Sequence, residues 1–233
     1  QHAVMIRTSL TQWTQSASHD LKGVIEVSFP VNLVCTLTGA TSGQLAAWRK
    51  GPSPLLAPEV AGKPRALYSF RDVVALRTVA SLRKEIPLQR IRRAFQSLQD
   101  MDLTDHPSRY TLTTDGTSVF LVEGEAVTDL VKSPRQQILV SLEDVFKPFV
   151  NWKGEKVVDF LNPRPHLEVR ETRMGGWPTI RGTRVAYGTI ANLVKGGEVS
   201  AEYVSEYFPT VSPMDVADAV DFDRQVESVG RRA

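Results

Sequence analysis

The side chains that most often carry catalysis are scattered along this chain instead of forming a motif. No H-E-x-x-H, G-x-S-x-G, phosphate-loop or dinucleotide-binding pattern accompanies the histidines, which are His2, His19, His106 and His166. Carboxylates at helical spacing near the C-terminal end are typical of solvated faces and helix caps. The single cysteine, Cys35, cannot form an internal disulfide and is expected to be a small buried residue. We therefore expect no enzyme, no cofactor and no metal site.

Charge is distributed unevenly along the chain, although the formal net charge is only +2. Residues 36–100 contain eleven basic and four acidic residues, which gives this segment a net charge of +7. Residues 200–223 contain six acidic residues and no basic one. A strongly basic segment predicts contact with nucleic acid, and an acidic one predicts that its end of the chain stays away from DNA.

Two short helices around a glycine turn are predicted in the N-terminal half. Apolar residues recur at helical spacing over 31–37 after Pro30, a tight turn follows at 38–40, and Thr41 can cap a second helix over 42–49. This is the pattern of a helix-turn-helix, whose second helix presents polar side chains to the major groove. The alternative is an ordinary helical hairpin whose polar residues face water. The candidates for contact with bases or phosphates are Thr41, Ser42 and Gln44.

The remaining segments are predicted to alternate between helices and short strands. Prolines and glycines make residues 51–64 a loop or wing, and Ser69 followed by Asp72 is the pattern of a helix cap. Alternating apolar residues around Asp115-Gly116 predict a hairpin. The predicted strands are 24–29 and 166–169, residues 152–165 are read as a connector, and the further predicted helices are 70–84, 87–98, 189–195, 200–208 and 212–226.

The N-terminal pattern resembles a known DNA-binding domain. The run from Thr36 to Arg49, the proline-rich loop and the run from Arg65 to Asp72 are similar to the MerR-type winged-helix domain over about residues 30–100. This resemblance implies a recognition helix at 41–49 and wing contacts to the DNA backbone from Arg65 and Tyr68. The absence of a cysteine-rich metal loop and of a long dimerising helix argues against a metal or drug sensor. The DNA-binding candidates are Thr41, Ser42, Gln44, Arg49, Arg65, Tyr68 and Arg71.

A second resemblance covers about residues 163–224. The sequence Gly-Gly-Trp-Pro-Thr-Ile-Arg-Gly-Thr-Arg-Val at 175–185 and the apolar pattern at 212–220 resemble a small antitoxin-associated domain marked by G-x-P-x-I-x-G-T-R. In Tyr207-Phe208-Pro209, Phe208 is an insertion relative to the Tyr-Pro that is usual in that family. Members of that family are commonly encoded beside PIN-domain ribonuclease toxins. Together with a MerR-like N-terminal half, the chain resembles a long VapB-type antitoxin.

This resemblance implies a PIN-domain ribonuclease as partner. Such a nuclease has a carboxylate-lined metal site, which an arginine of an antitoxin can cover. For Arg181 and Arg184 the alternative is pairing with the acidic helices of their own domain. The glycines and the proline of the motif are expected to have structural roles. The toxin-binding candidates are Arg181, Arg184, Arg231 and Arg232.

These observations predict an α+β, mainly helical chain. The expected parts are an N-terminal lead (1–29), a MerR-like winged-helix domain (30–100), a small β-rich region with a connector (101–161), a compact three-helix domain (162–226) and a tail (227–233). No run of residues is long and apolar enough to span a membrane, and no secretory signal is recognisable, so we expect a cytoplasmic location.

The expected function is that of an antitoxin, which neutralises a PIN-domain ribonuclease toxin and represses its own operator as a homodimer. One alternative is a ligand-responsive transcriptional regulator whose C-terminal domain is the sensor. Another is a protein-interaction module whose helix-turn-helix likeness is only architectural. Salt-sensitive DNA binding separates this last reading from the other two, because a basic DNA-binding face releases counterions when it binds.

Overall fold

The computed structural model describes residues 27–51, 54–101, 108, 111–114, 118–123, 126–131, 146–197 and 199–231. Within these ranges the chain is α+β, with helices and small antiparallel sheets, which confirms the predicted class. No helix in them is long and apolar enough to cross a membrane. The predicted lead before residue 27 and the last two residues of the tail lie outside the described residues.

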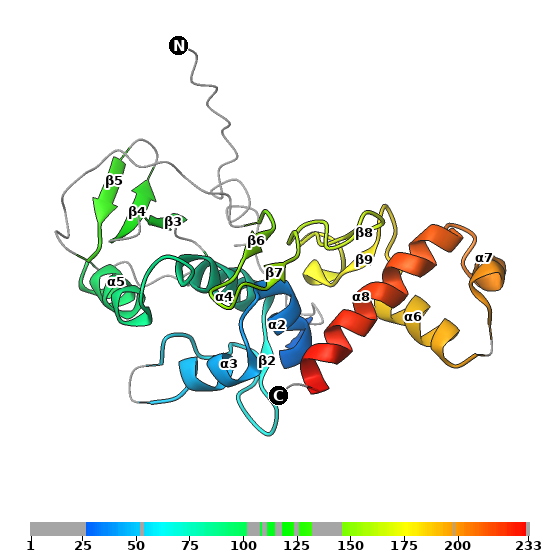
Figure 1. The fold of residues 1–233 in the computed structure, drawn as a ribbon, viewed down its shortest axis with the longest axis horizontal. Coiled ribbons are helices and arrows are strands. Elements are labelled where there is room, and N and C mark those ends of the chain that lie inside the picture. The colour runs from blue at the N-terminus through cyan, green and yellow to red at the C-terminus, as the bar shows by residue number, and fades with distance from the viewer. Residues whose placement is uncertain are drawn as a thin grey trace, which may run out of the picture.

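The N-terminal half consists of helices and one two-stranded sheet (Figure 1). Both short helices predicted around the glycine turn are present, and the helix predicted over 70–84 ends slightly earlier. Strand β1 pairs antiparallel with β2, so that Phe29 lies opposite Tyr68. The elements are β1 (Phe29–Pro30), α2 (Val31–Thr38), α3 (Ser42–Trp48), β2 (Leu67–Tyr68), α4 (Phe70–Leu82) and α5 (Leu88–Asp100).

Local hydrogen bonds explain where α2 ends and α3 begins. Gly39 has a φ of 75°, and its N–H donates to the carbonyl of Cys35 at 2.8 Å. A left-handed backbone of this kind favours glycine and ends the helix. The Thr41 hydroxyl then accepts from the N–H of Gln44, while the N–H of Thr41 donates to Oε1 of Gln44. This capping box confirms Thr41 as the predicted cap of the second helix.

The middle region contains short antiparallel strands. The predicted hairpin is confirmed, with Leu112 of β3 opposite Leu121 of β4. Residues 152–165 were expected to be a connector, but part of this stretch forms a second hairpin, β6–β7. Its strands have only two residues each, too few for a period-two pattern to indicate them. The strands are β3 (Thr111–Thr114), β4 (Val119–Glu123), β5 (Ala126–Asp129), β6 (Phe149–Val150) and β7 (Lys156–Val157).

The C-terminal part combines a two-stranded sheet with helices. Strand β8 confirms the predicted strand near residue 167, and it pairs antiparallel with β9. The last helix continues past the predicted end at residue 226, and the middle helical segment is a 3-10 turn followed by one short α-helix. The elements are β8 (Leu167–Glu168), η2 (Met174–Gly176), β9 (Thr179–Ile180), α6 (Tyr187–Lys195), η3 (Ala201–Tyr203), α7 (Val204–Tyr207) and α8 (Pro213–Arg231).

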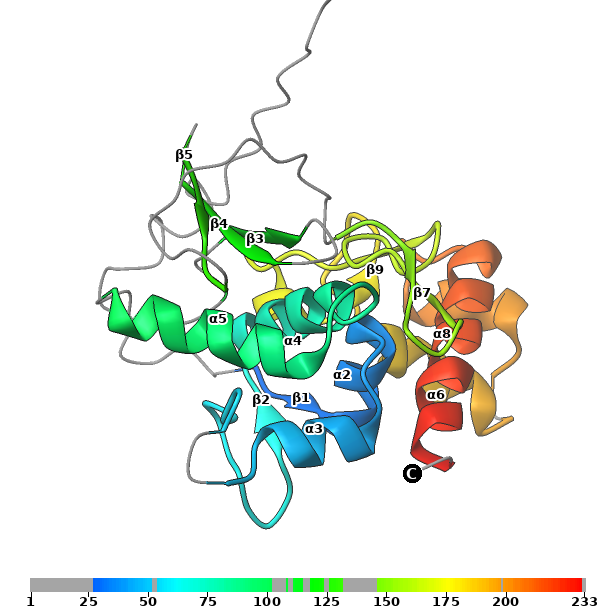
Figure 2. The same ribbon diagram turned by 60° about the vertical axis from the view of Figure 1, so that its left-hand side comes forward.

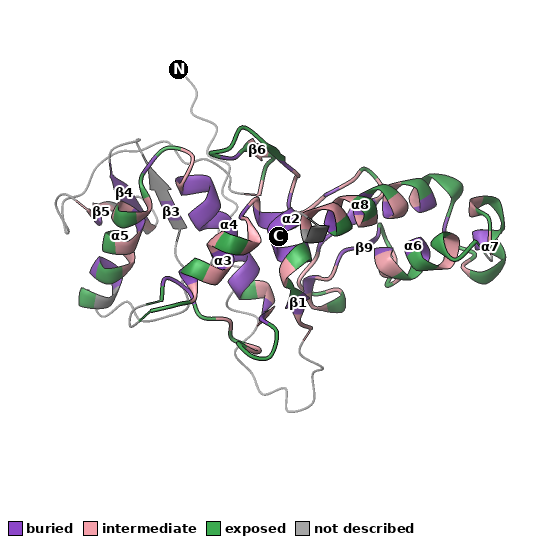
Figure 3. Ribbon diagram, turned by 60° about the horizontal axis from the view of Figure 1, so that its bottom comes forward, coloured by how far each residue is buried: buried purple, intermediate pink, exposed green. Residues whose placement is uncertain are grey.

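Both halves share one hydrophobic core. Helix α2 packs against α4 and also against α8, whose red C-terminal part lies beside α2 in Figures 1 and 2. Ring contacts continue between the halves, from Phe29 to Trp177 at 5.6 Å between centroids, and then to Tyr187 at 6.5 Å. Figure 3 shows α2 and α4 largely buried, whereas α7 and one face of α8 are exposed. The helix that braces α3 is therefore held by the C-terminal part of the chain.

One arginine ties α4 to the middle of the chain. Arg77 is fully buried, and its guanidinium donates to the carbonyl of Leu37 at the end of α2. It also donates to the carbonyls of Phe146 at 3.0 Å, Lys147 at 2.7 Å and Val158 at 2.9 Å. Arg77 is one of the eleven basic residues of segment 36–100, but its burial removes it from any binding surface.

Candidate nucleic-acid and partner interfaces

Helix α3 and the loop before β2 lie at the same end of the molecule, the lower end in Figures 1 and 2. Ser42 is partly exposed at the first turn of α3, while Leu45 and Trp48 on the other face are buried. Thr41 and Gln44 are also partly exposed, but the capping box occupies the Thr41 hydroxyl and Oε1 of Gln44. The polar start of α3 is thus held rigidly at the surface.

Arg65 is the most accessible of the predicted wing residues. It is exposed, and no side-chain hydrogen bond or ion pair to it occurs among the described residues. Its neighbours along the loop, Lys63 and Pro64, are exposed as well. An exposed guanidinium without an internal partner can donate to a phosphate without first breaking another bond.

Tyr68 does not share this exposure. Its side chain is 1% exposed, and its hydroxyl has no hydrogen-bond partner among the described residues. Burial raises the pKa of Tyr68, and the nearby positive charge of Arg49 counteracts part of this increase. Strand β2 places the ring in the core opposite Phe29, so that it cannot reach a DNA phosphate in this conformation. We therefore leave Tyr68 out of the candidate interface and keep Arg49, which is partly exposed.

Arg71 is exposed but already has an anionic partner. Its guanidinium lies 2.6 Å from Oε1 of Glu59, whose other carboxylate oxygen accepts from the hydroxyl of Ser69. Asp72 completes this arrangement, because it accepts from the N–H groups of both Glu59 and Ser69. The predicted cap of α4 is confirmed, and it also anchors the loop that precedes β2. DNA would have to compete with Glu59 for Arg71.

The glycine-rich motif of the C-terminal part contacts α4. Gly176 has a φ of 83°, and a Cβ atom at this position would lie 2.1 Å from Cδ2 of Phe70. Gly175 lies equally close to Val27, because a Cβ atom added at Gly175 would lie 2.8 Å from Cγ2 of Val27. The expected structural role of these glycines is thus explained by close packing between the motif and the N-terminal half.

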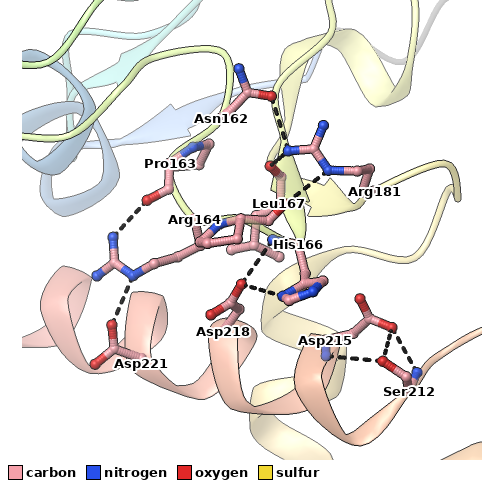
Figure 4. Close-up of polar contacts among 11 residues, drawn as sticks. Asn162, Pro163, Arg164, His166, Leu167, Arg181, Ser212, Asp215, Asp218 and Asp221 are labelled. Carbon is pink, nitrogen blue, oxygen red and sulfur yellow. Dashed lines mark hydrogen bonds and ion pairs between the residues drawn. The ribbon is translucent and has the colours of Figure 1, made fainter.

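The predicted toxin-binding arginines differ in availability. Arg181 donates to the carbonyl of Pro165 at 2.9 Å. It also donates to Oδ1 of Asn162 at 3.1 Å (Figure 4). Its partners are therefore backbone and amide oxygens, not the acidic helices. Arg184 is exposed and has no side-chain hydrogen bond or ion pair among the described residues. Arg231 ends α8, but its side chain and the whole of Arg232 lie outside the described residues.

The acidic residues of α8 hold the segment before β8. Asp218 accepts from the backbone N–H of His166 and lies 2.8 Å from Nδ1 of the same residue (Figure 4). Asp221 lies 2.7 Å from Nε of Arg164. Sequence analysis missed these pairs, although carboxylates three residues apart on one helix face are a recognisable signal. Much of the acidic charge near the C-terminal end is thus engaged within the chain.

A shallow groove of about 600 Å³ runs between residues 148–164 and α8. Its lining includes three basic side chains, of Lys156, Arg164 and Arg224, and two acidic ones, of Asp159 and Asp221. No group of three or more His, Cys, Asp or Glu side chains that could hold a metal ion occurs among the described residues. Cys35 is buried, which raises the pKa of its thiol to about 12 and keeps the thiol protonated at neutral pH.

Comparison of the chain with curated proteins and with solved structures gave no match. A family match covers part of the C-terminal region only, from the start of β8 into α8. Residues 167–222, which include the glycine-rich motif, match the family described as "Protein of unknown function (DUF433)".

Proposed function

We propose that this chain is an antitoxin of a type II toxin-antitoxin system. It binds operator DNA as an autorepressing homodimer through a MerR-like winged-helix domain, residues 30–100, and neutralises a PIN-domain ribonuclease toxin through the compact helical domain at 162–226. The arrangement that carries the proposal is the capped helix α3 behind the left-handed turn at Gly39, with exposed basic residues in the adjacent loop. Ser42, in the first turn of α3, is partly exposed and can face the major groove.

The proposed DNA interface combines two kinds of contact. Ser42 and Gln44 on α3 are the candidates for base edges, and Thr41 positions that helix through its cap. Arg49 and Arg65 are the candidates for phosphates, because both carry a permanent charge at the surface. Arg71 joins them only if DNA displaces it from Glu59. A homodimer would double these contacts on a palindromic site, which light scattering of the purified chain tests directly.

Replacing Arg65 with alanine should weaken binding to the DNA upstream of the chain's own coding region about tenfold, since one charge-assisted hydrogen bond is lost. The slope of log affinity against log salt should fall by about 0.9, because one fewer counterion is released. Fluorescence anisotropy at several salt concentrations measures both effects. Arg184→Ala, an exposed arginine on the C-terminal part, is the matched control and should leave both values unchanged.

For the toxin, Arg184 is the strongest of the predicted contact residues, because it is exposed and has no side-chain partner among the described residues. Arg184→Ala should weaken inhibition of the ribonuclease about tenfold or more, as expected for an interfacial arginine that covers a carboxylate-lined site. Arg65→Ala serves as the reciprocal control and should inhibit as the unchanged chain does. Equal inhibition by both variants would remove Arg184 from the interface and leave Arg181, Arg231 and Arg232 to be tested.

The groove between residues 148–164 and α8 favours a second candidate function, that of a ligand-responsive regulator. Its excess of basic side chains suits a small anion, and it borders the helix that packs against α2. In that case a small anionic ligand would change the DNA affinity of the purified chain with no toxin present. The substitution Arg224→Ala, in the groove wall, would abolish this response.

A further inference from the structure

The β6–β7 hairpin is anchored to the turn that precedes α3. The side-chain amide of Asn151 donates to the carbonyl of Gly39 at 3.1 Å. From the other strand, Val157 approaches so closely that a Cβ atom at Gly39 would lie 2.3 Å from its Cγ2. Because the first residues of a recognition helix approach the bases, an element fixed to the turn before it lies next to the duplex. The hairpin tip therefore has a fixed position relative to the proposed DNA interface.

The tip presents an aromatic ring between two cations. Trp152 is 47% exposed, and the guanidinium of Arg83 lies 5.7 Å from its ring centroid. The ammonium of Lys153 lies 5.5 Å from the same ring. Neither cation forms an ion pair with a described residue, and Nε of Arg83 is buried without a hydrogen-bond partner among them. The ring thus lies beside the partly exposed Arg83 and the exposed Lys153, neither of which is neutralised by a carboxylate of a described residue.

One further cation and one carboxylate lie near the tip. Lys156 at the base of the hairpin is exposed and forms no ion pair with a described residue. The only carboxylate within residues 149–157 is that of Glu155, which accepts from the side-chain amide of Asn151 at 3.1 Å. Cations grouped around an exposed aromatic ring are the surface chemistry of nucleic-acid contact.

We propose that the β6–β7 hairpin is a second DNA-contacting element, in which Arg83 and Lys153 bind backbone phosphates and Trp152 packs against the sugar edge between them. This inference rests on the proposed DNA binding by α3, and it extends the interface beyond the loop that carries Arg65. The hairpin lies outside the 30–100 segment to which the sequence assigned DNA contact, so its involvement would lengthen the stretch of duplex that one protomer covers.

The test compares Lys153→Met with Lys153→Arg in the full chain, using anisotropy of the upstream DNA fragment at several salt concentrations. Lys153→Met should weaken binding three- to tenfold and lower the salt slope by about 0.9, whereas Lys153→Arg keeps the charge and should retain both values. Trp152→Ala should weaken binding by a similar factor. Unchanged thermal unfolding midpoints for the Lys153 variants would show that the loss is one of contact and not of folding.

The outcomes separate this inference from the proposed function. If Arg65→Ala weakens binding but Lys153→Met and Trp152→Ala do not, the hairpin does not touch DNA and the inference is wrong, while the proposed DNA binding stands. If the unchanged chain binds no DNA at low salt, both are wrong. If Lys153→Met instead lowers only toxin inhibition, the hairpin is a protein-binding surface, which also overturns the inference.

Discussion

Replacement of Arg77 with methionine should destabilise the protein by about 3–5 kcal/mol. The methionine fills much of the same space but removes the donor to the carbonyls of Leu37, Lys147 and Val158. The carbonyl of Phe146 also loses the guanidinium, but it still accepts from the N–H of Phe160. Unsatisfied buried polar groups of this kind cost about 1–3 kcal/mol each, and relaxation recovers part of that sum. Urea unfolding followed by circular dichroism measures the loss.

A matched control for Arg77 lies on the same helix. Arg71→Met removes an arginine whose side chain is 53% exposed and forms an ion pair with Glu59. Solvent screens such a pair, so the expected loss is below about 1 kcal/mol. A loss of that small size for Arg77→Met as well would mean that its carbonyl contacts do not hold the middle of the chain to α2 and α4.

Gly176→Ala should destabilise the protein by about 2–5 kcal/mol. The added methyl group would meet the ring of Phe70, which is itself packed against Phe29 and Phe160 and has little room to move. Overpacking of this kind costs about 1–3 kcal/mol, and the left-handed backbone adds about 1–2 kcal/mol for a residue with a Cβ atom. Thermal or urea unfolding of the purified variant measures the total.

Gly182→Ala separates the two contributions. Gly182 has a similar φ of 75°, but nothing lies within 4 Å of a Cβ at this position. Only the backbone contribution applies, and the expected loss is about 1–2 kcal/mol. If Gly176→Ala lowers the free energy of unfolding no more than Gly182→Ala does, the glycine-rich motif does not pack tightly against α4, and the two halves are not in close contact there.

The features that sequence analysis predicted well depend on neighbours along the chain. Thr41 with Gln44 and Ser69 with Asp72 are three residues apart, so a capping box is visible in the sequence itself. The turn at Gly39 is equally local. The hairpin around residues 115–116 also follows from adjacent alternating segments, and the antiparallel pairing of the described strands β3 and β4 confirms it.

The features that were missed depend on contacts between distant segments. Arg77 is indistinguishable in sequence from the surface arginines of segment 36–100, because only the fold brings four carbonyls around it. Tyr68 was assigned to the DNA backbone by resemblance, yet its strand places it in the core. Trp152 was read as part of a connector, since nothing in its own segment indicates that Arg83 will lie beside it. Periodicity carries no information on such long-range pairs.

The shared core also changes how the expected parts relate to one another. Sequence analysis separated a DNA-binding part from a C-terminal part by composition and charge. In the structure, Trp177 of the motif lies against Phe29, and α8 packs against α2. If the C-terminal part binds a toxin and α8 moves, the movement would directly affect α2, the helix that braces α3.

The proposed antitoxin function requires that this chain inhibit a ribonuclease. If the adjacent gene encodes a PIN-domain protein, the full chain would be titrated into that protein, with cleavage of a labelled RNA as the readout. For an antitoxin, we expect cleavage to fall linearly with added chain and to stop near a fixed stoichiometric ratio, with both proteins eluting together from a sizing column. Unchanged cleavage at a tenfold excess of the chain, with the two proteins eluting separately, would contradict the antitoxin function.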